Sequence, residues 1–268
     1  MKPSLLMCAP EYFGVRYAIN PWMKGQIGKV DPALAMQQWA RFYRTLRKQA
    51  EVHLINPQRH VPDLVFTANA GLMHEGHFIP SRFKHEERRR EEPLFREWFE
   101  NRSSRNTTLP KNIYFEGAGD ALFQPGRDFI WAGYGFRTDR EAHSFLAEHF
   151  QMQVFSLHLI HPSFYHLDTC FCPLLDGQVM YYPAAFDEPS LQTIEGLIKP
   201  ENRIIVSDED AVQFACNAVL VDRVLFLNHA GPELVKTLER KGYTPVIQPV
   251  SEFLKAGGAN KCLTLALT

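Results

Sequence analysis

The chain has 268 residues, and its 29 Lys and Arg nearly balance its 30 Asp and Glu, which leaves a formal net charge of −1. This balance gives no basic surface for nucleic acid or an anionic membrane, and no stretch predicts a membrane-spanning segment or a signal peptide. Five cysteines without the spacing of a disulfide framework favour a soluble protein of the reducing cytoplasm.

A unit of amphipathic helix, short strand, small-residue turn and returning strand begins near residue 31. Asp31 and Pro32 are residue types preferred at the N-cap and the first position of a helix. A strand at 52–55, a turn at 66–71 and a hairpin at 75–76 follow.

The same order of elements is predicted four more times. The second unit has a helix at 94–99, a strand at 113–115, a turn at 116–120 and a hairpin at 125–126; the third has a helix at 140–149, a strand at 154–160, a turn at 165–168 and a hairpin at 176–177; the fourth has a helix near Ile194, a strand at 204–206 and paired strands around 222–223; the fifth has a helix at 232–241, a strand at 246–250 and apolar residues 263–265.

One polar residue recurs at the same place in each unit, and these residues are Asn69, Glu116, His166, Asn217 and Cys262. Subtracting their numbers gives steps of 47, 50, 51 and 45 positions. Such near-equal steps predict a closed ring of ββα-type units in a single domain spanning 1–268, with the loops before the inner strands at one common mouth. An ordinary α/β sheet also alternates strands and helices, but it does not require the polar residue to recur.

Cys262 follows a glycine-containing loop and precedes an apolar tail. Gly257 and Gly258 would let the backbone approach a ligand closely, and Lys261 is expected to lower the pKa of the thiol. The alternative for any single cysteine is a small buried apolar residue at the start of a strand.

A thiol, an imidazole and carboxylates at one mouth would suit covalent catalysis on an electrophilic carbon. Cys262 would attack as a thiolate, His166 would transfer the proton, and a carboxylate would orient the histidine and hold a cationic substrate. Glu116, with Asp120 four residues later, would need a cationic partner if buried. His166 and Asp168 lie on one face of an extended segment, so both would point at a ligand if that face is the mouth.

Four segments carry a resemblance to a known family, and they are residues 66–69 (FTAN), 115–120 (FEGAGD), 165–168 (YHLD) and 257–262 (GGANKC). Together they resemble the guanidine-modifying superfamily of arginine deiminases, dimethylarginine dimethylaminohydrolases, amidinotransferases and arginine dihydrolases. The resemblance covers essentially the whole chain and implies a five-bladed α/β-propeller, called a pentein. It also implies Cys262 as nucleophile, His166 as acid and base, and Glu116 as the carboxylate bound to His166 and to the guanidinium.

Asn69 departs from the pattern of arginine deiminases, which have Asp in the matching segment. An amide keeps an acceptor and adds a donor, so a neutral ureido group would be tolerated better beside it. In this respect the chain resembles the arginine dihydrolases, hydrolases that convert arginine to ornithine, ammonia and carbon dioxide. Dimethylarginine dimethylaminohydrolase, arginine deiminase, citrulline hydrolase and amidinotransferase remain alternatives. A non-catalytic pentein binding module is the alternative of another class.

The resemblance implies further substrate contacts, and the full set of candidates is Asn20, Asn69, Arg88, Asp120, Arg137, Asp168 and Ala256. Arg88 and Arg137 match positions that the family uses for the substrate carboxylate, a task suited to the bidentate fork of arginine. Asn20 and the backbone carbonyl of Ala256 match positions that contact the amino acid. A turn at Asn20 and a solvated helix face at 85–92 are the simpler alternatives.

No metal or cofactor is expected. Cys170 and Cys172, with His161 and His166 nearby, do not have the spacing of a zinc site. The expected partner is a small molecule, namely arginine, citrulline or a methylarginine, and the sequence leaves a homo-oligomer open.

Overall fold

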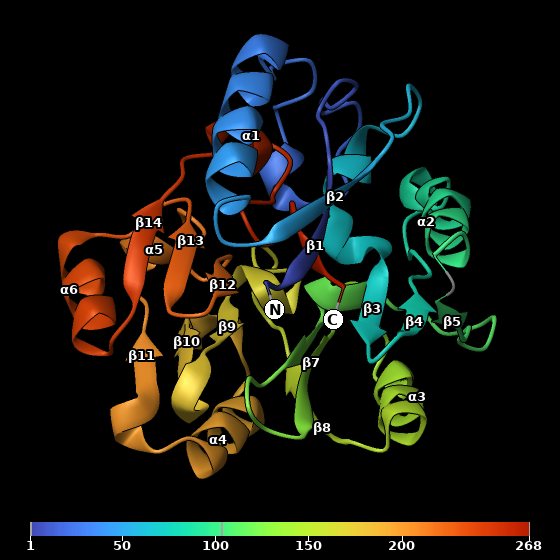
Figure 1. The fold of residues 1–268 in the computed structure, drawn as a ribbon. Helices are drawn as coiled ribbons and strands as arrows, with labels where there is room; N and C mark the ends of the chain where they lie inside the picture. The colour runs from blue at the N-terminus through green and yellow to red at the C-terminus, as the bar shows by residue number, and fades with distance from the viewer. Residues whose placement is uncertain (1, 103, 268) are drawn as a thin grey trace.

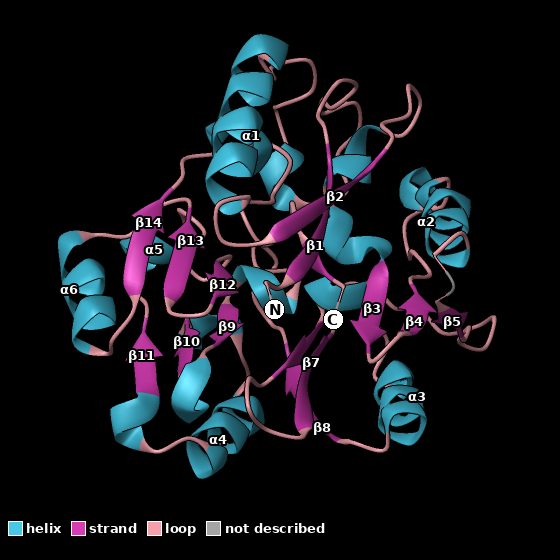
Figure 2. Cartoon of the chain, viewed as in Figure 1, coloured by secondary structure: helices cyan, strands magenta, loops and turns pink. Residues whose placement is uncertain are grey.

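The computed structural model describes residues 2–102 and 104–267, which form an α/β fold with five three-stranded sheets. In Figure 1 the sheets are arranged around the centre of the molecule and the longer helices lie at the periphery, a division that Figure 2 shows by colour. The helices are α1 (Pro32–Leu46), α2 (Glu91–Glu100), α3 (Glu141–Phe150), α4 (Glu188–Leu197), α5 (Asp208–Ala211), α6 (Pro232–Arg240) and α7 (Ser251–Leu254).

Each sheet repeats one hydrogen-bonding pattern: the first two strands are antiparallel, and the third is parallel to the second. A helix lies in each parallel crossover, because the chain must return to the same end of the sheet. Four sheets are built from consecutive strands: β3 (Gly71–His74), β4 (His77–Pro80) and β5 (Arg105–Asn106); β6 (Ala121–Phe123), β7 (Phe129–Tyr134) and β8 (Gln153–His158); β9 (Phe171–Pro173), β10 (Val179–Tyr181) and β11 (Arg203–Ile205); β12 (Val219–Val221), β13 (Val224–Leu227) and β14 (Thr244–Ile247).

The fifth sheet joins segments from near both ends of the described chain. β15 (Leu265–Ala266) is antiparallel to β1 (Ser4–Cys8), with Leu6 opposite Leu265, and β1 is parallel to β2 (Glu51–Ile55). The chain ends accordingly lie near each other at the centre of Figure 1. The expected fivefold repetition of one unit is confirmed, and β15 takes the place that the first strand has in every other sheet.

Local sequence signals fix several element ends as expected. The side chain of Asp31 accepts hydrogen bonds from the backbone N–H groups of Ala33 and Leu34, so it is the N-cap of α1. The hairpin between β3 and β4 turns at Glu75 and Gly76, which have φ of +48° and +80°. Two consecutive left-handed residues match the twist of the flanking strands.

The predicted strand at 113–115 is wrong. Only Phe115 forms an isolated bridge, with Arg82, and the third strand of that sheet is β5. Side chains satisfy the neighbouring backbone instead, since Tyr114 N–H donates to Asp139 Oδ2 at 2.8 Å and Glu116 N–H donates to Thr138 Oγ1 at 3.0 Å. The last predicted strand is displaced as well, because β14 ends at Ile247 rather than at residue 250.

The apolar core lies between the sheets and their helices. Phe78 of β4 stacks on Phe99 of α2, for example, and both are almost completely buried. The loops that carry the recurring polar residues are enclosed by this core, so that their exposures range only from 0% for Glu116 and Asn217 to 3% for Cys262. Burial of so many polar groups requires specific partners.

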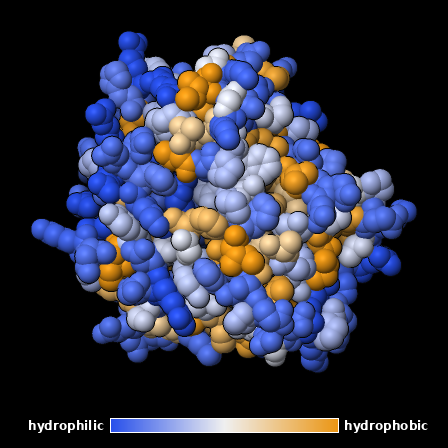
Figure 3. All heavy atoms as spheres, turned by 180° about the vertical axis from the view of Figure 1, so that it is seen from behind, coloured by the Kyte–Doolittle hydropathy of each residue, from blue (hydrophilic) through white to orange (hydrophobic). Residues whose placement is uncertain are grey.

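Within residues 2–102 and 104–267, none of the helices has the length and apolar character needed to cross a bilayer. Seen from behind, the surface carries small groups of apolar side chains scattered among polar ones (Figure 3). Such scattered groups are normal for a folded protein and indicate no particular partner.

Candidate active site

The five recurring polar residues all lie in the loop two to five positions before the first strand of their sheets. Asn69 precedes β3, Glu116 precedes β6, His166 precedes β9, Asn217 precedes β12 and Cys262 precedes β15. Direct contacts join neighbours in this series: Asn69 Nδ2 donates to the Glu116 carbonyl at 2.9 Å, and Glu116 Oε2 lies 2.8 Å from His166 Nε2. The fold thus brings together side chains that are about 50 residues apart in sequence.

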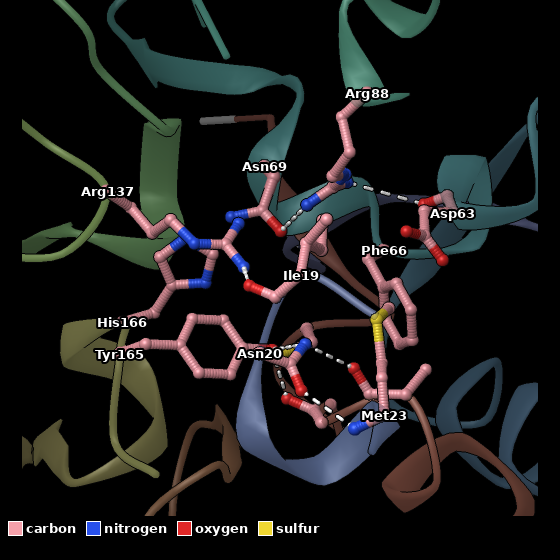
Figure 4. A pocket seen from close by; sticks show the side chains of 14 residues that line it. Ile19, Asn20, Met23, Asp63, Phe66, Asn69, Arg88, Arg137, Tyr165 and His166 are labelled. Carbon is pink, nitrogen blue, oxygen red and sulfur yellow. Dashed lines mark hydrogen bonds between the residues drawn. The ribbon is translucent and has the colours of Figure 1, made fainter. Parts of the chain in front are cut away.

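A narrow pocket, with a cavity volume of only about 10 Å³, lies at this meeting point. Seven of the ten candidate site residues line it, and they are Asn20, Asn69, Arg88, Arg137, His166, Ala256 and Cys262. Figure 4 shows the guanidinium groups of Arg88 and Arg137 on either side of Asn69, with His166 and Tyr165 near Arg137. Glu116, Asp168 and Asp120 are not among the lining residues and lie behind them.

Cys262 is held between a carboxyl and an amide. Its Sγ lies 3.4 Å from Asp168 Oδ2 and accepts a hydrogen bond from Asn217 Nδ2 at 3.1 Å. Burial, followed by the charge of Asp168, raises the pKa of the thiol well above its ordinary value. The charge of Lys261 acts to lower this pKa, as expected, but burial and the charge of Asp168 outweigh it. The free protein therefore holds a protonated thiol that a base must activate.

The loop before Cys262 requires glycine at two places. Gly257 has φ of +83°, and a Cβ there would lie 2.7 Å from the Tyr165 hydroxyl oxygen. A Cβ on Gly258 would lie 2.6 Å from the ring of Phe66 and 3.1 Å from the Cβ of Cys262. Tyr165 in turn donates its hydroxyl to the Gly257 carbonyl at 2.7 Å. The loop can approach the pocket this closely only without side chains at these positions.

His166 and Glu116 form a buried pair suited to proton transfer. Burial lowers the pKa of His166 to about 4, against the opposing effect of Glu116. Burial alone would raise the pKa of Glu116, but the charge of Arg137 and the hydrogen bond from His166 hold it below its usual range. At neutral pH this leaves a neutral imidazole beside an ionised carboxylate. Such a histidine can accept a proton from a thiol and later return it.

Arg137 provides the cation that compensates Glu116. Its Nη1 lies 3.1 Å from Glu116 Oε2, its Nη2 donates to the Ile19 carbonyl at 3.0 Å, and its guanidinium lies over the ring of Tyr165 at 4.6 Å. The resemblance assigned this arginine to a substrate carboxylate, whereas in the structure it is bound to Glu116. Arg137 therefore lies between the pocket and the carboxylate.

Arg88 is buried, with 4% of its surface exposed, although its neighbours Arg89 and Arg90 are exposed. It donates two hydrogen bonds to the Glu91 carboxylate, at 2.8 and 2.7 Å, and one to Asn69 Oδ1 at 2.9 Å. The alternative of a solvated helix face is wrong for this residue. The bidentate pair orients the guanidinium so that it reaches Asn69 in the pocket wall.

Asn20 fastens the N-terminal loop over the pocket. Its Nδ2 donates to the Ala256 carbonyl at 3.0 Å and to the Tyr165 hydroxyl at 3.2 Å. Its Oδ1 accepts from Met23 N–H at 3.1 Å, which caps the short helix Pro21–Met23. The turn and the pocket contact that the sequence offered as alternatives therefore coexist, and Figure 4 shows these bonds together.

Asp120 and Asp168 do not reach the pocket as expected of substrate contacts. Asp120 accepts hydrogen bonds from the Thr138 hydroxyl at 2.7 Å and from Leu167 N–H at 3.0 Å, so it supports the loop of His166. Asp168 instead faces the thiol of Cys262, and burial raises its pKa to about 6. Both carboxyl groups point inward because their hydrogen-bond donors lie there.

Sequence reasoning missed several residues of the site. Asp63 and Tyr165 line the pocket, and Asp63 Oδ2 accepts the Tyr17 hydroxyl at 2.8 Å. Asn217 was recognised in the repeat but was given no role. Asp63 could have been found because it is a single carboxyl inside the apolar run 61–66, and a buried carboxyl needs a hydrogen-bonding or charged partner.

Comparison with known proteins gives consistent relatives. A family model described as N,N dimethylarginine dimethylhydrolase, eukaryotic, matches residues 9–268. Over 263 residues the chain is 49% identical to the bifunctional arginine dihydrolase/ornithine cyclodeaminase AgrE of Nostoc sp.. The match covers 98% of this chain and 37% of that protein. Over 262 residues it is 37% identical to the N(G),N(G)-dimethylarginine dimethylaminohydrolase of Mycobacterium tuberculosis, covering 97% of this chain and 84% of that protein.

A solved structure is also closely similar. It is the N-terminal domain of ArgZ, an arginine dihydrolase from Cyanobacteria, as a cysteine-to-serine mutant bound to substrate. The TM-score is 0.98 at 47% identity, with 99% of this chain and 98% of that chain covered. The chain spans only 37% of the length of the bifunctional curated relatives that it matches.

Proposed function

The chain belongs to the dimethylarginine dimethylaminohydrolase-type family of guanidine-modifying proteins, and we propose that it is an arginine dihydrolase that forms ornithine, ammonia and carbon dioxide. One observation carries the proposal: the amide of Asn69, held between Glu116 and Arg88, lines the pocket that also contains Cys262 and His166. We further propose that the five sheets form the closed propeller of a pentein, with residues 1–268 as one catalytic domain. All five cysteines are free and buried, which supports our proposal that the protein acts in a reducing cytoplasm.

Substrate binding begins with an exchange of cations on Glu116. Arg137 lines the pocket while Glu116 lies behind it, so an incoming guanidinium meets Arg137 first. The guanidinium of the substrate replaces that of Arg137 on the carboxylate, and Arg137 becomes free to bind the substrate carboxylate. The buried negative charge remains compensated throughout, as a charge in this setting must be.

The first hydrolysis uses the thiol and the imidazole in turn. His166 accepts the proton of Cys262, and the thiolate forms a C–S bond to the central guanidinium carbon. The resulting imidazolium donates its proton to the departing nitrogen, the C–N bond breaks, and ammonia leaves a thiouronium adduct. His166 then removes a proton from water, which attacks the same carbon. The C–S bond breaks with return of a proton to sulfur, and the product is citrulline.

The second hydrolysis repeats these steps on the ureido carbon. Attack by Cys262 expels the second ammonia, and water releases a carbamate that decomposes to ornithine and carbon dioxide. Two waters are consumed for the two ammonias and the carbon dioxide released. The ureido group is neutral, so an amide at position 69, which offers a donor as well as an acceptor, suits it better than a carboxylate would.

A dimethylarginine dimethylaminohydrolase is the second candidate. The description of the matching family model and the Mycobacterium tuberculosis relative favour it. The same cysteine and histidine chemistry would apply, with dimethylamine as the leaving group and citrulline as the final product.

Product identification separates the two candidates. Purified protein is incubated with arginine, citrulline or asymmetric dimethylarginine, and amino-acid products and ammonia are quantified by chromatography. Ornithine with two ammonias per arginine is expected, and Cys262→Ser is the inactive control. Citrulline accumulating from arginine without ornithine rejects the dihydrolase, and turnover of dimethylarginine alone favours the second candidate.

A further inference from the structure

Asn217 is completely buried in the loop before β12, and its side chain makes four hydrogen bonds around Cys262. Its Oδ1 accepts the backbone N–H groups of Ala259 and Cys262, both at 3.1 Å. Its Nδ2 donates to the Asp168 carbonyl at 3.0 Å and to Cys262 Sγ at 3.1 Å. These bonds use both acceptor sites and both donors of the amide.

The backbone of Asn217 contributes as well, because its carbonyl accepts Lys261 N–H at 3.1 Å. One residue therefore joins three loops: its own, the loop of Asp168 and the loop of Cys262. The Asp168 loop also carries His166, so Asn217 fixes the position of the nucleophile Cys262 relative to its proton acceptor.

We infer that Asn217 is a positioning residue for the nucleophile, whose amide clamps the Cys262 loop and donates a hydrogen bond to the sulfur that attacks the substrate carbon. The inference rests on the proposed function only in that Cys262 is the nucleophile. Nothing in it depends on whether the second hydrolysis occurs.

The donor at sulfur has a distinct chemical effect. Two titratable groups act on the pKa of the thiol, Asp168 and Lys261, and burial and the charge of Cys262 in turn raise the pKa of the neighbouring Tyr165. Asp168 opposes the thiolate, and Lys261 favours it from outside hydrogen-bonding distance. The backbone of Ala259 and the side chain of Asn217 both act to lower the pKa of the thiol, and Asn217 Nδ2 donates to Sγ at 3.1 Å. Hydrogen bonds to an ionised partner are stronger than those to a neutral one, so this donor stabilises the thiolate more than the thiol.

A buried asparagine could instead serve only to hold the loop, and Asn217→Asp distinguishes the two roles. Aspartate has nearly the same shape and keeps the acceptor for both backbone N–H groups. It replaces the donor with a carboxylate oxygen that faces the sulfur and the Asp168 carbonyl. Because the new carboxylate would also raise the thiol pKa by its charge, Asn217→Ser, which adds no charge, completes the comparison: a purely structural role predicts a normal thiol pKa in the serine variant.

The experiment measures alkylation of Cys262 by iodoacetamide as a function of pH, with the modified peptide identified by mass spectrometry. We expect the apparent pKa of Cys262 to rise by roughly one to two pH units in Asn217→Asp, because the sulfur loses a hydrogen bond and gains a negative neighbour. Alkylation at pH 8 should fall at least about 10-fold, and kcat for arginine should fall about 10- to 100-fold with little change in KM. Asn217→Ser, which keeps a small hydroxyl and adds no charge, should recover part of the loss.

Asn228→Asp is the matched control. Asn228 is also buried and also bridges backbone groups, since it donates to the Gln213 carbonyl and accepts Val250 N–H, but it does not touch Cys262. Asn217→Ser decides the question if the aspartate variant fails to fold. The inference is overturned if the apparent pKa of Cys262 in the Asn217 variants equals that of the unmodified protein. It is also overturned if Asn228→Asp changes this pKa by the same amount. Alkylation needs no turnover, so an absence of arginine hydrolysis would reject the proposed function while the thiol titration still decides the role of Asn217.

Discussion

The thiol of Cys262 lies 3.4 Å from Oδ2 of Asp168, so the proposed nucleophile rests against a buried carboxyl group. Both groups have a raised pKa, Asp168 to about 6 and Cys262 well above its ordinary value. Each negative charge disfavours the other, and burial disfavours both. Without substrate, the thiol of Cys262 therefore stays protonated until a cation enters the pocket.

Asp168→Asn should lower the pKa of Cys262. The substitution removes a negative neighbour, so the thiolate forms at lower pH and alkylation by iodoacetamide at pH 7 becomes faster. The pH profile of alkylation measures this directly. Asp176→Asn, which changes an exposed carboxyl paired with Arg223, is the control and should leave the profile unchanged. A profile of Asp168→Asn that is unchanged or displaced to higher pH would contradict this electrostatic account.

The same substitution should change how stability depends on pH. An acid whose folded pKa is raised binds its proton more tightly when folded, so it stabilises the protein below its unfolded pKa near 4 and loses this contribution as pH rises through about 6. Between pH 4 and 7, Asp168→Asn should gain up to about 3 kcal/mol in unfolding free energy relative to the unmodified protein. Urea unfolding at the two pH values tests the difference. If the unfolding free energy of Asp168→Asn relative to the unmodified protein decreases as pH rises, the pKa of Asp168 is not raised.

Much of this architecture could be predicted from sequence because its repeat is regular. Near-equal spacing from Asn69 to Cys262 indicated five units, and every one of those polar residues precedes the first strand of its sheet. The strand at 113–115 was wrong because Asp139 and Thr138, distant in sequence, supply the backbone partners there. The inward orientation of Asp120 and Asp168 depends on such partners as well, and a motif does not reveal them.

Asn69→Asp should make citrulline accumulate from arginine. The carboxylate adds a negative charge beside Glu116 and Arg88 and loses the donor to the Glu116 carbonyl. A cationic guanidinium still binds such a site, whereas a neutral ureido group gains less from it. The ratio of citrulline to ornithine at equal arginine consumption is the measurement, with Asn228→Asp as the control for an added buried charge. An unchanged ratio would show that residue 69 does not select between the two hydrolyses.

Arg88→Met should strongly destabilise the fold. Glu91 is 0% exposed and would lose the bidentate partner that compensates its charge. Breaking one side of a buried pair typically costs about 3 to 5 kcal/mol, whereas the exposed pair Lys236–Glu233 should cost less than about 1 kcal/mol when broken by Lys236→Ala. Urea unfolding compares the two. Adding Glu91→Gln to Arg88→Met should recover part of the loss, and a failure to recover any would mean that packing rather than charge is responsible.

Gly258→Ala should impair catalysis more than folding. The added Cβ would lie 2.6 Å from the Phe66 ring and 3.1 Å from the Cβ of Cys262, so the loop or the ring must move and the sulfur moves with the loop. A misplacement of this size at a nucleophile can lower kcat about 100-fold. Gly196→Ala is the matched control, because a Cβ there meets nothing within 4 Å and alanine favours the helix α4 by up to about 1 kcal/mol. Steady-state kinetics with arginine and thermal unfolding of both variants test the contrast. Equal activity in the two would mean that the glycine loop does not fix the position of Cys262.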